Sequence, residues 1–123
     1  MSYLFPSKDA ELIRCFLHED RRLVACLCAA WCSSCRAWQA DFLELAKNHP
    51  KDCFVWVDIE DHSDLVAEID LETLPVLLIQ DAESVHFLGP IQPRFPQVVN
   101  MLLMRNETSG DFPDPGLRDF LME

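Results

Sequence analysis

The sequence is poor in basic residues and contains no long hydrophobic run. Lys and Arg number 10 against 21 Asp and Glu in 123 residues, which gives a formal charge of −11. Phosphate backbones and anionic membrane surfaces repel such a chain, so we expect neither nucleic acid nor a membrane as a partner. No apolar run approaches the roughly 20 residues that a transmembrane helix needs. Residues 1–6 also lack the basic region and apolar core of a secretory signal, which favours a cytoplasmic location.

The cysteines divide into two kinds by their sequence neighbours. Without an export signal, the six cysteines are expected to be mostly reduced, and any disulfide to be catalytic. Free cysteine packs as a small hydrophobe, so we expect a core position for the four in apolar segments: Cys15, Cys26, Cys28 and Cys53. Cys32 and Cys35 differ because Ser33, Ser34 and Arg36 flank them. These two are the candidate functional thiols.

This C-x-x-C pair stands where a predicted strand turns into a predicted helix. Residues 23–29 form a short apolar run typical of a buried strand, and the apolar positions 38, 42, 45 and 46 recur at helical spacing. Cys32 therefore lies at or near a helix start, where unpaired N–H groups and the helix dipole favour a thiolate. A thiolate attacks disulfides and also binds metals. The position alone leaves dithiol chemistry and metal binding both open.

The rest of the chain alternates helices and strands. With 50% hydrophobic and 25% charged residues, it is expected to fold as one globular domain with a substantial core. The predicted order is a helix capped by Ser7, strand 23–29, a helix from Cys32 to about 48, strand 53–59, helix 63–69, strands 75–79 and 83–88, and helix 93–104. This order predicts a mixed sheet with helices on both faces. We divide the chain into a domain over 1–105 and an acidic, mobile tail over 106–123, in which Leu117, Phe120 and Leu121 could form a short docking element.

Several motifs together resemble the thioredoxin family over roughly residues 8–105. Residues 30–35, Ala-Trp-Cys-Ser-Ser-Cys after an apolar strand, resemble its W-C-x-x-C active site. Residues 73–75, Thr-Leu-Pro at a strand start, resemble its active-site cis-proline, and proline is the residue at which a cis bond costs little. Residues 57–60 resemble the end of its central strand, and Leu88-Gly89 resembles the glycine beside its peptide groove. The resemblance implies an α/β thioredoxin fold, with a central mixed sheet of four to five strands between helices.

The resemblance also implies roles for individual residues. Cys32 would be the exposed nucleophile, Cys35 the buried resolving thiol, and Pro75 a wall beside both sulfurs. The Leu74 backbone would pair with an extended substrate segment. The active-site wall and substrate groove would comprise Trp31, Ser33, Ser34, Thr73, Leu74, Pro75, Leu88 and Gly89.

Three departures from the family pattern alter these expectations. Ser33-Ser34 replaces the usual Gly-Pro, and two hydroxyls able to donate to sulfur predict a more oxidising pair. Cys26 and Trp56 stand where the family has a buried aspartate and its lysine partner. We treat both as modulating residues, because a less polar pocket should make Cys35 resolve mixed disulfides slowly. Cys26 could also be a third redox group, although simple core packing is the main alternative.

The third departure is Cys28, which replaces an aromatic residue and shares a strand face with Cys26. A tetrahedral site of Cys26, Cys28, Cys32 and Cys35 is conceivable, but buried strand thiols rarely converge so on a helix start, and we expect no metal.

The leading hypothesis is a thiol–disulfide oxidoreductase acting on proteins with disulfides or thiols. It needs no cofactor beyond the Cys32–Cys35 disulfide, and it requires an electron donor such as thioredoxin reductase or glutathione. The alternative is a binding module or accessory chaperone of the same fold with little or no redox turnover. The intact cysteine pair favours the enzyme. The absence of the family's buried aspartate and lysine, together with the acidic tail, favours the alternative.

Overall fold

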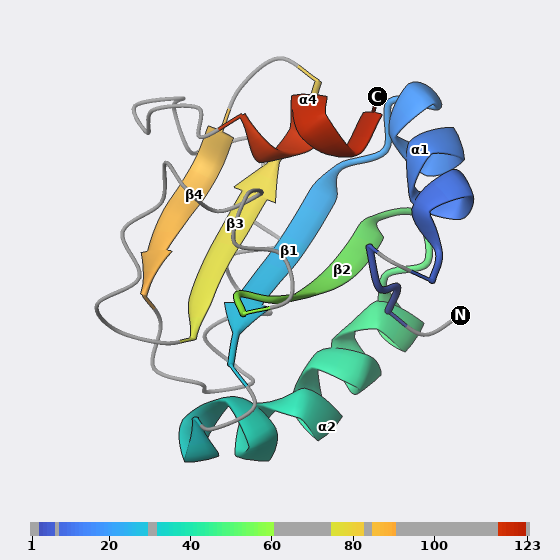
Figure 1. The fold of residues 1–123 in the computed structure, drawn as a ribbon. Helices are drawn as coiled ribbons and strands as arrows, with labels where there is room; N and C mark the ends of the chain where they lie inside the picture. The colour runs from blue at the N-terminus through green and yellow to red at the C-terminus, as the bar shows by residue number, and fades with distance from the viewer. Residues whose placement is uncertain are drawn as a thin grey trace.

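The computed structural model describes residues 3–6, 8–29, 32–60, 75–82, 85–90 and 116–122 (Figure 1). Its helices are α1 (Ala10–His18), α2 (Ser33–Asn48) and α4 (Leu117–Met122), and its strands are β1 (Leu23–Cys28), β2 (Cys53–Asp58), β3 (Val76–Gln80) and β4 (Val85–Pro90). The four strands begin and end within two residues of the predicted bounds. The predicted helices over 63–69 and 93–104 and the predicted Ser7 cap lie outside the described residues.

The strands form one mixed sheet in the order β2-β1-β3-β4. β1 runs parallel to β2 and antiparallel to β3, and β3 runs antiparallel to β4. Every residue of β1 is buried, as expected for a central strand with an uninterrupted apolar run that is covered on both faces. Leu4 adds a bridge beyond β2, because its N–H donates to the Phe54 carbonyl and its own carbonyl accepts from the Trp56 N–H, both at 2.8 Å.

The side chains of β1 alternate between two core clusters. Leu23, Ala25 and Leu27 join the cluster that includes Ile13 and Leu17 of α1. Val24, Cys26 and Cys28 join the cluster packed under α2. In Figure 1, α1 and α4 lie near one end of the sheet, whereas α2 begins beside the carboxyl end of β1. The predicted arrangement of a mixed sheet between helices is therefore confirmed.

The start and the outer face of α1 differ from the sequence prediction. Asp9 occupies the N-cap position without a side-chain cap bond, and its Oδ2 instead accepts from the Phe5 N–H at 2.9 Å. The expectation that Cys15 is buried is wrong, since Cys15 is exposed. Ile13 and Leu17 are the buried residues of this helix, and a residue midway between positions i and i+4 points to the opposite side.

Residues 116–122 are docked rather than mobile, and Leu117 and Leu121 act as the short docking element that the sequence analysis allowed for. Gly116, at φ 83°, turns the chain into α4, and Leu117 is fully buried against α1 and the sheet. The buried Arg118 guanidinium donates to the carbonyl oxygens of Leu17 at 3.2 Å, Arg21 at 2.8 Å and Gln80 at 3.5 Å. Acidic composition predicted solvation, but Leu117, Leu121 and Met122 pack on the core cluster and Arg118 bonds to it through carbonyl oxygens. No described helix is long and apolar enough to cross a membrane.

Candidate active site

The C-x-x-C pair lies at the junction between β1 and α2. Cys32 is the N-cap residue of α2, with extended backbone angles of φ −86° and ψ 112°. Its N–H donates to the Ala29 carbonyl at 3.1 Å, and its carbonyl accepts from the Arg36 N–H at 3.2 Å, which fixes the turn between strand and helix. Cys32 is partly exposed and Cys35 is buried, both as free thiols. The pair thus has one sulfur open to a reactant and one sulfur behind it.

The start of α2 favours negative charge at the first sulfur. A helix N-terminus carries unpaired N–H groups and the positive end of the dipole, and the first turn of α2 contains no acidic residue that would offset it. Ser33 and Ser34 are exposed in this first turn. The idea that their hydroxyls donate to sulfur stays a prediction.

The surroundings of Cys35 disfavour its charged form. Burial raises the pKa of the Cys35 thiol well above its usual range, and a hydrogen bond with the Cys28 thiol adds to the rise. A hydrogen bond with the Ala29 backbone offsets part of it. Cys35 shares the cluster beneath α2 with large apolar side chains such as Trp38 and Phe42. At neutral pH the second thiol is therefore protonated.

Cys28 is buried, as predicted, but the sequence analysis did not foresee that it shares a cluster with Cys35. Its Sγ lies 3.4 Å from the Sγ of Cys26. The hydrogen bond with Cys26, followed by burial, raises the pKa of Cys28 far above its usual range. Cys35 belongs to the same cluster and the partly exposed Cys32 packs against it, so the four cysteines gather beneath the start of α2. The alternation of Cys26 and Cys28 on one strand face was the signal for this cluster.

The arrangement of the four cysteines also bears on metal binding. Among the residues that the structure describes, no group of three or more His, Cys, Asp or Glu is arranged to hold a metal ion. The cluster is therefore interpreted as a set of thiols, and the absence of a metal stays a prediction.

Trp56 makes the interior beneath α2 aromatic. It lies beside Cys26 in the register of β1 and β2 and is 8% exposed. Its ring stacks on Tyr3 with 5.7 Å between centroids and meets Phe42 edge-on at 5.6 Å. An indole packed in this way supplies no charge to Cys35, which agrees with the prediction of a less polar pocket.

Pro75 and Gly89 lie on the same side of the sheet as the thiols. The β1–β3 register ends at Leu27 opposite Val76, so the buried Pro75 comes next, beside Cys28. Gly89 pairs with Leu77, whose side chain belongs to the cluster beneath α2. A Cβ at Gly89 would make only an ordinary contact, 3.7 Å from Phe87 Cζ.

Leu88 is on the other side of the sheet. It packs against the α1 cluster, so its side chain does not line the predicted groove, and only its backbone could do so. Alternation along β4 explains this difference, because neighbouring strand residues point to opposite faces. Trp31, Thr73 and Leu74 lie outside the described residues.

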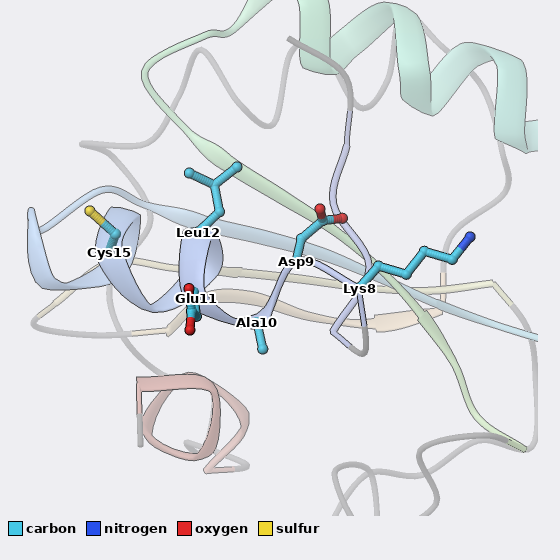
Figure 2. Close-up of a pocket in the computed structure, with 6 residues that line it drawn as sticks. All are labelled: Lys8, Asp9, Ala10, Glu11, Leu12 and Cys15. Atoms are coloured by element: carbon cyan, nitrogen blue, oxygen red, sulfur yellow. The ribbon is translucent and has the colours of Figure 1, made fainter.

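A separate hollow borders α1, away from the C-x-x-C pair. Figure 2 shows its lining residues, with Leu12 and Cys15 on one side of the helix and Ala10 and Glu11 on another; Lys8 and Asp9 complete it. Its volume is about 660 Å³. Its one thiol, Cys15, is exposed on α1 and does not belong to the cluster beneath α2, so this hollow does not extend the thiol cluster.

Comparison with known proteins gives one consistent result. The family model described as Thioredoxin matches residues 7–92. A thioredoxin H-type of Picea mariana is 36% identical over 69 residues, which are 54% of this chain and 55% of the relative. The chain thus spans little more than half the length of that curated relative.

Solved structures agree in fold at low sequence identity. A poplar wild-type thioredoxin h has a TM-score of 0.74 at 14% identity, covering 89% of this chain and all of its own. Thioredoxin f2, in its complex with ferredoxin:thioredoxin reductase, has a TM-score of 0.68 at 13% identity, covering 86% of this chain and 94% of its own. These structures confirm the predicted α/β fold class.

Proposed function

The chain belongs to the thioredoxin family, and from this premise we propose that it is a thiol–disulfide oxidoreductase acting on protein disulfides. One observation carries the proposal: Cys32 is partly exposed at the N-cap of α2, and it packs against the buried cluster that contains Cys35 of the first helical turn. Exposed dithiols of this kind are the labile, catalytic ones.

The proposed reaction has two steps. The Cys32 thiolate attacks one sulfur of a substrate disulfide, forms a mixed disulfide, and releases the other substrate sulfur as a thiolate that takes up a proton. Cys35 then loses its proton and attacks the Sγ of Cys32, which releases the second substrate thiol. The protein ends with a Cys32–Cys35 disulfide, and two electrons have passed to the substrate.

Residues around the pair would hold the substrate. In this proposal, Pro75, which follows the β1–β3 register, and Gly89 of β4 would border an extended substrate segment. Trp31, Thr73 and Leu74 would complete the groove, as in the family that the chain resembles. Proteins with disulfides or thiols are the proposed partners.

Another turnover requires an electron donor. A disulfide reductase or the glutathione pool of a reducing compartment such as the cytoplasm would restore the dithiol. The complex of thioredoxin f2 with a reductase supports a protein donor. No resident metal or organic cofactor enters the reaction.

The test of this function is a redox titration in thiol–disulfide buffers, with each cysteine followed by alkylation and mass spectrometry. We expect a reversible Cys32–Cys35 disulfide with a midpoint between about −120 and −270 mV, the span of known oxidoreductases. A pair that never oxidises would refute the enzyme and leave the binding module as the better function. The exposed Cys15 gives an internal reference, because it has no partner in the proposed chemistry.

The second step should be slow at neutral pH and should accelerate as the pH rises. The raised pKa of Cys35 keeps the resolving thiol protonated, and below that pKa its thiolate fraction grows tenfold for each pH unit. A preformed mixed disulfide between Cys32 and a chromogenic thiol, mixed into buffers from pH 6 to 9, measures the release rate. A rate independent of pH over this range would contradict the assignment of a protonated Cys35.

A further inference from the structure

Cys35 has two sulfur neighbours, of which the proposed reaction uses only one. Cys28, at the end of β1, and Cys35 belong to the same buried cluster beneath α2, and Cys32 packs against that cluster from the surface. Cys28 is buried, and no step of substrate reduction needs it. A thiol in contact with a redox-active sulfur is a nucleophile already in place for disulfide exchange.

We propose that Cys28 is a second disulfide partner of Cys35, so that the oxidised protein exists as two isomers. The inference rests on the proposed function, since it starts from the Cys32–Cys35 disulfide. The Cys28 sulfur attacks the Sγ of Cys35, the Cys28–Cys35 bond forms, and the Cys32–Cys35 bond breaks. The proton lost by Cys28 is balanced by the one that Cys32 takes up. No electrons leave the protein, and no further oxidant is needed.

The fold places these two sulfurs together on two regular elements. Cys28 is the last residue of β1, and Cys35 lies in the first turn of α2. The Ala29–Cys32 hydrogen bond of 3.1 Å closes the short connection between them. Cys26, with its Sγ 3.4 Å from that of Cys28, is reduced in the structure, whereas Cys35 is the neighbour that the proposed reaction oxidises. Exchange from Cys28 is therefore directed to Cys35.

The exchange should be slow compared with substrate reduction. Attack requires a thiolate, and the Cys26 contact and burial keep Cys28 protonated. Rapid turnover would thus use Cys32 and Cys35 alone. The second isomer would accumulate only when the oxidised protein waits for its electron donor.

The second isomer has a different reactivity. Cys32 becomes a free, partly exposed thiol while Cys35 is held by Cys28. If Cys32 then attacks a substrate disulfide, the mixed disulfide has no resolving thiol and persists. The isomer would convert a reductase into a protein that retains its substrate.

The experiment traps the free Cys32. The purified full chain is oxidised with one equivalent of diamide, freed of reagent, and incubated with iodoacetamide under native conditions. After an acid quench, remaining thiols are labelled with N-ethylmaleimide and the chain is digested with chymotrypsin. Cleavage after Leu27 and Trp31 separates Cys26, Cys28 and the 32–38 peptide, whereas all four cysteines share one tryptic peptide, 23–36.

Two results distinguish the isomers. We expect oxidised molecules to acquire the iodoacetamide label on Cys32 over time, with an equal fraction of peptide 28–31 cross-linked to peptide 32–38. In Cys28→Ala, Cys32 should stay unlabelled after oxidation. Cys26→Ala, the matched change of the neighbouring strand thiol, should retain both the labelling and the cross-link.

The inference is overturned if every disulfide stays within peptide 32–38 and Cys32 remains blocked. It is also overturned if Cys26→Ala stops the labelling while Cys28→Ala does not. Failure of the proposed function looks different, because the oxidised protein would then contain no Cys32–Cys35 disulfide at time zero. The disulfide map of the wild-type protein alone decides whether the Cys28–Cys35 bond forms, so this test does not depend on the folding of a variant.

Discussion

Serine in place of Cys32 should reduce the catalysed reduction of insulin disulfides by dithiothreitol to the uncatalysed rate. The hydroxyl is close to the thiol in shape but is a far weaker nucleophile, so the helix start no longer presents a group that attacks disulfides. Removal of a nucleophile from an enzyme costs about 1,000-fold or more. Turbidity of the precipitating insulin chains measures the rate.

Two companion variants make this result specific. Cys15→Ser changes the exposed cysteine of α1, which lies outside the thiol cluster, and should keep the wild-type rate. Cys35→Ser should accumulate a covalent adduct between Cys32 and substrate, visible on a non-reducing gel, because the mixed disulfide forms but is not resolved. Wild-type activity in Cys32→Ser would remove Cys32 from the chemistry altogether.

The position of the cysteine pair was predictable because local patterns determine it. An apolar run followed by helical periodicity places Cys32 at a strand–helix junction whatever the rest of the chain does. The same period-two rule puts Cys26 and Cys28 on one face. That they share a cluster with Cys35 was not predictable, since it depends on how closely α2 approaches the end of β1.

The C-terminal helix illustrates the opposite case. Acidic residues, glycines and prolines make up much of residues 106–123. The average composition of a segment does not reveal which few of its residues become buried. Arg118 docks α4 by donating to carbonyl oxygens from three distant segments, contacts that no local pattern encodes. Burial lowers the pKa of Arg118, and the nearby carboxylates of Asp20 and Asp81 oppose that shift.

The site also shows how an apolar interior changes the chemistry of a familiar motif. In this chain the neighbours of Cys35 are thiols and aromatic rings, so the charged form of the resolving thiol has little stabilisation. Slow resolution and exchange with Cys28 are two consequences of that one environment. Both would lengthen the life of the mixed disulfide with the substrate. An enzyme that holds its substrate in this way would act in part as the binding module of the alternative hypothesis.

Leu117→Ala should lower the free energy of unfolding by about 2–5 kcal/mol, the cost of truncating a fully buried leucine. Leu117 is 0% exposed and packs in the cluster that contains Ile13 and Leu17, so its removal leaves a cavity between α4 and α1. Urea unfolding followed by circular dichroism measures the change. A mobile tail would instead predict a difference near zero.

The matched control is Asp119→Ala, an exposed side chain two residues further along the same helix. A surface change of this kind should stay within about 0.5 kcal/mol of the wild type. Since α4 lies at the end of the sheet away from the start of α2 (Figure 1), Leu117→Ala should leave the midpoint of the Cys32–Cys35 pair unchanged while the protein remains folded. A shifted midpoint would mean that α4 reaches the active site through the sheet, and equal stabilities of the two variants would mean that α4 is not docked.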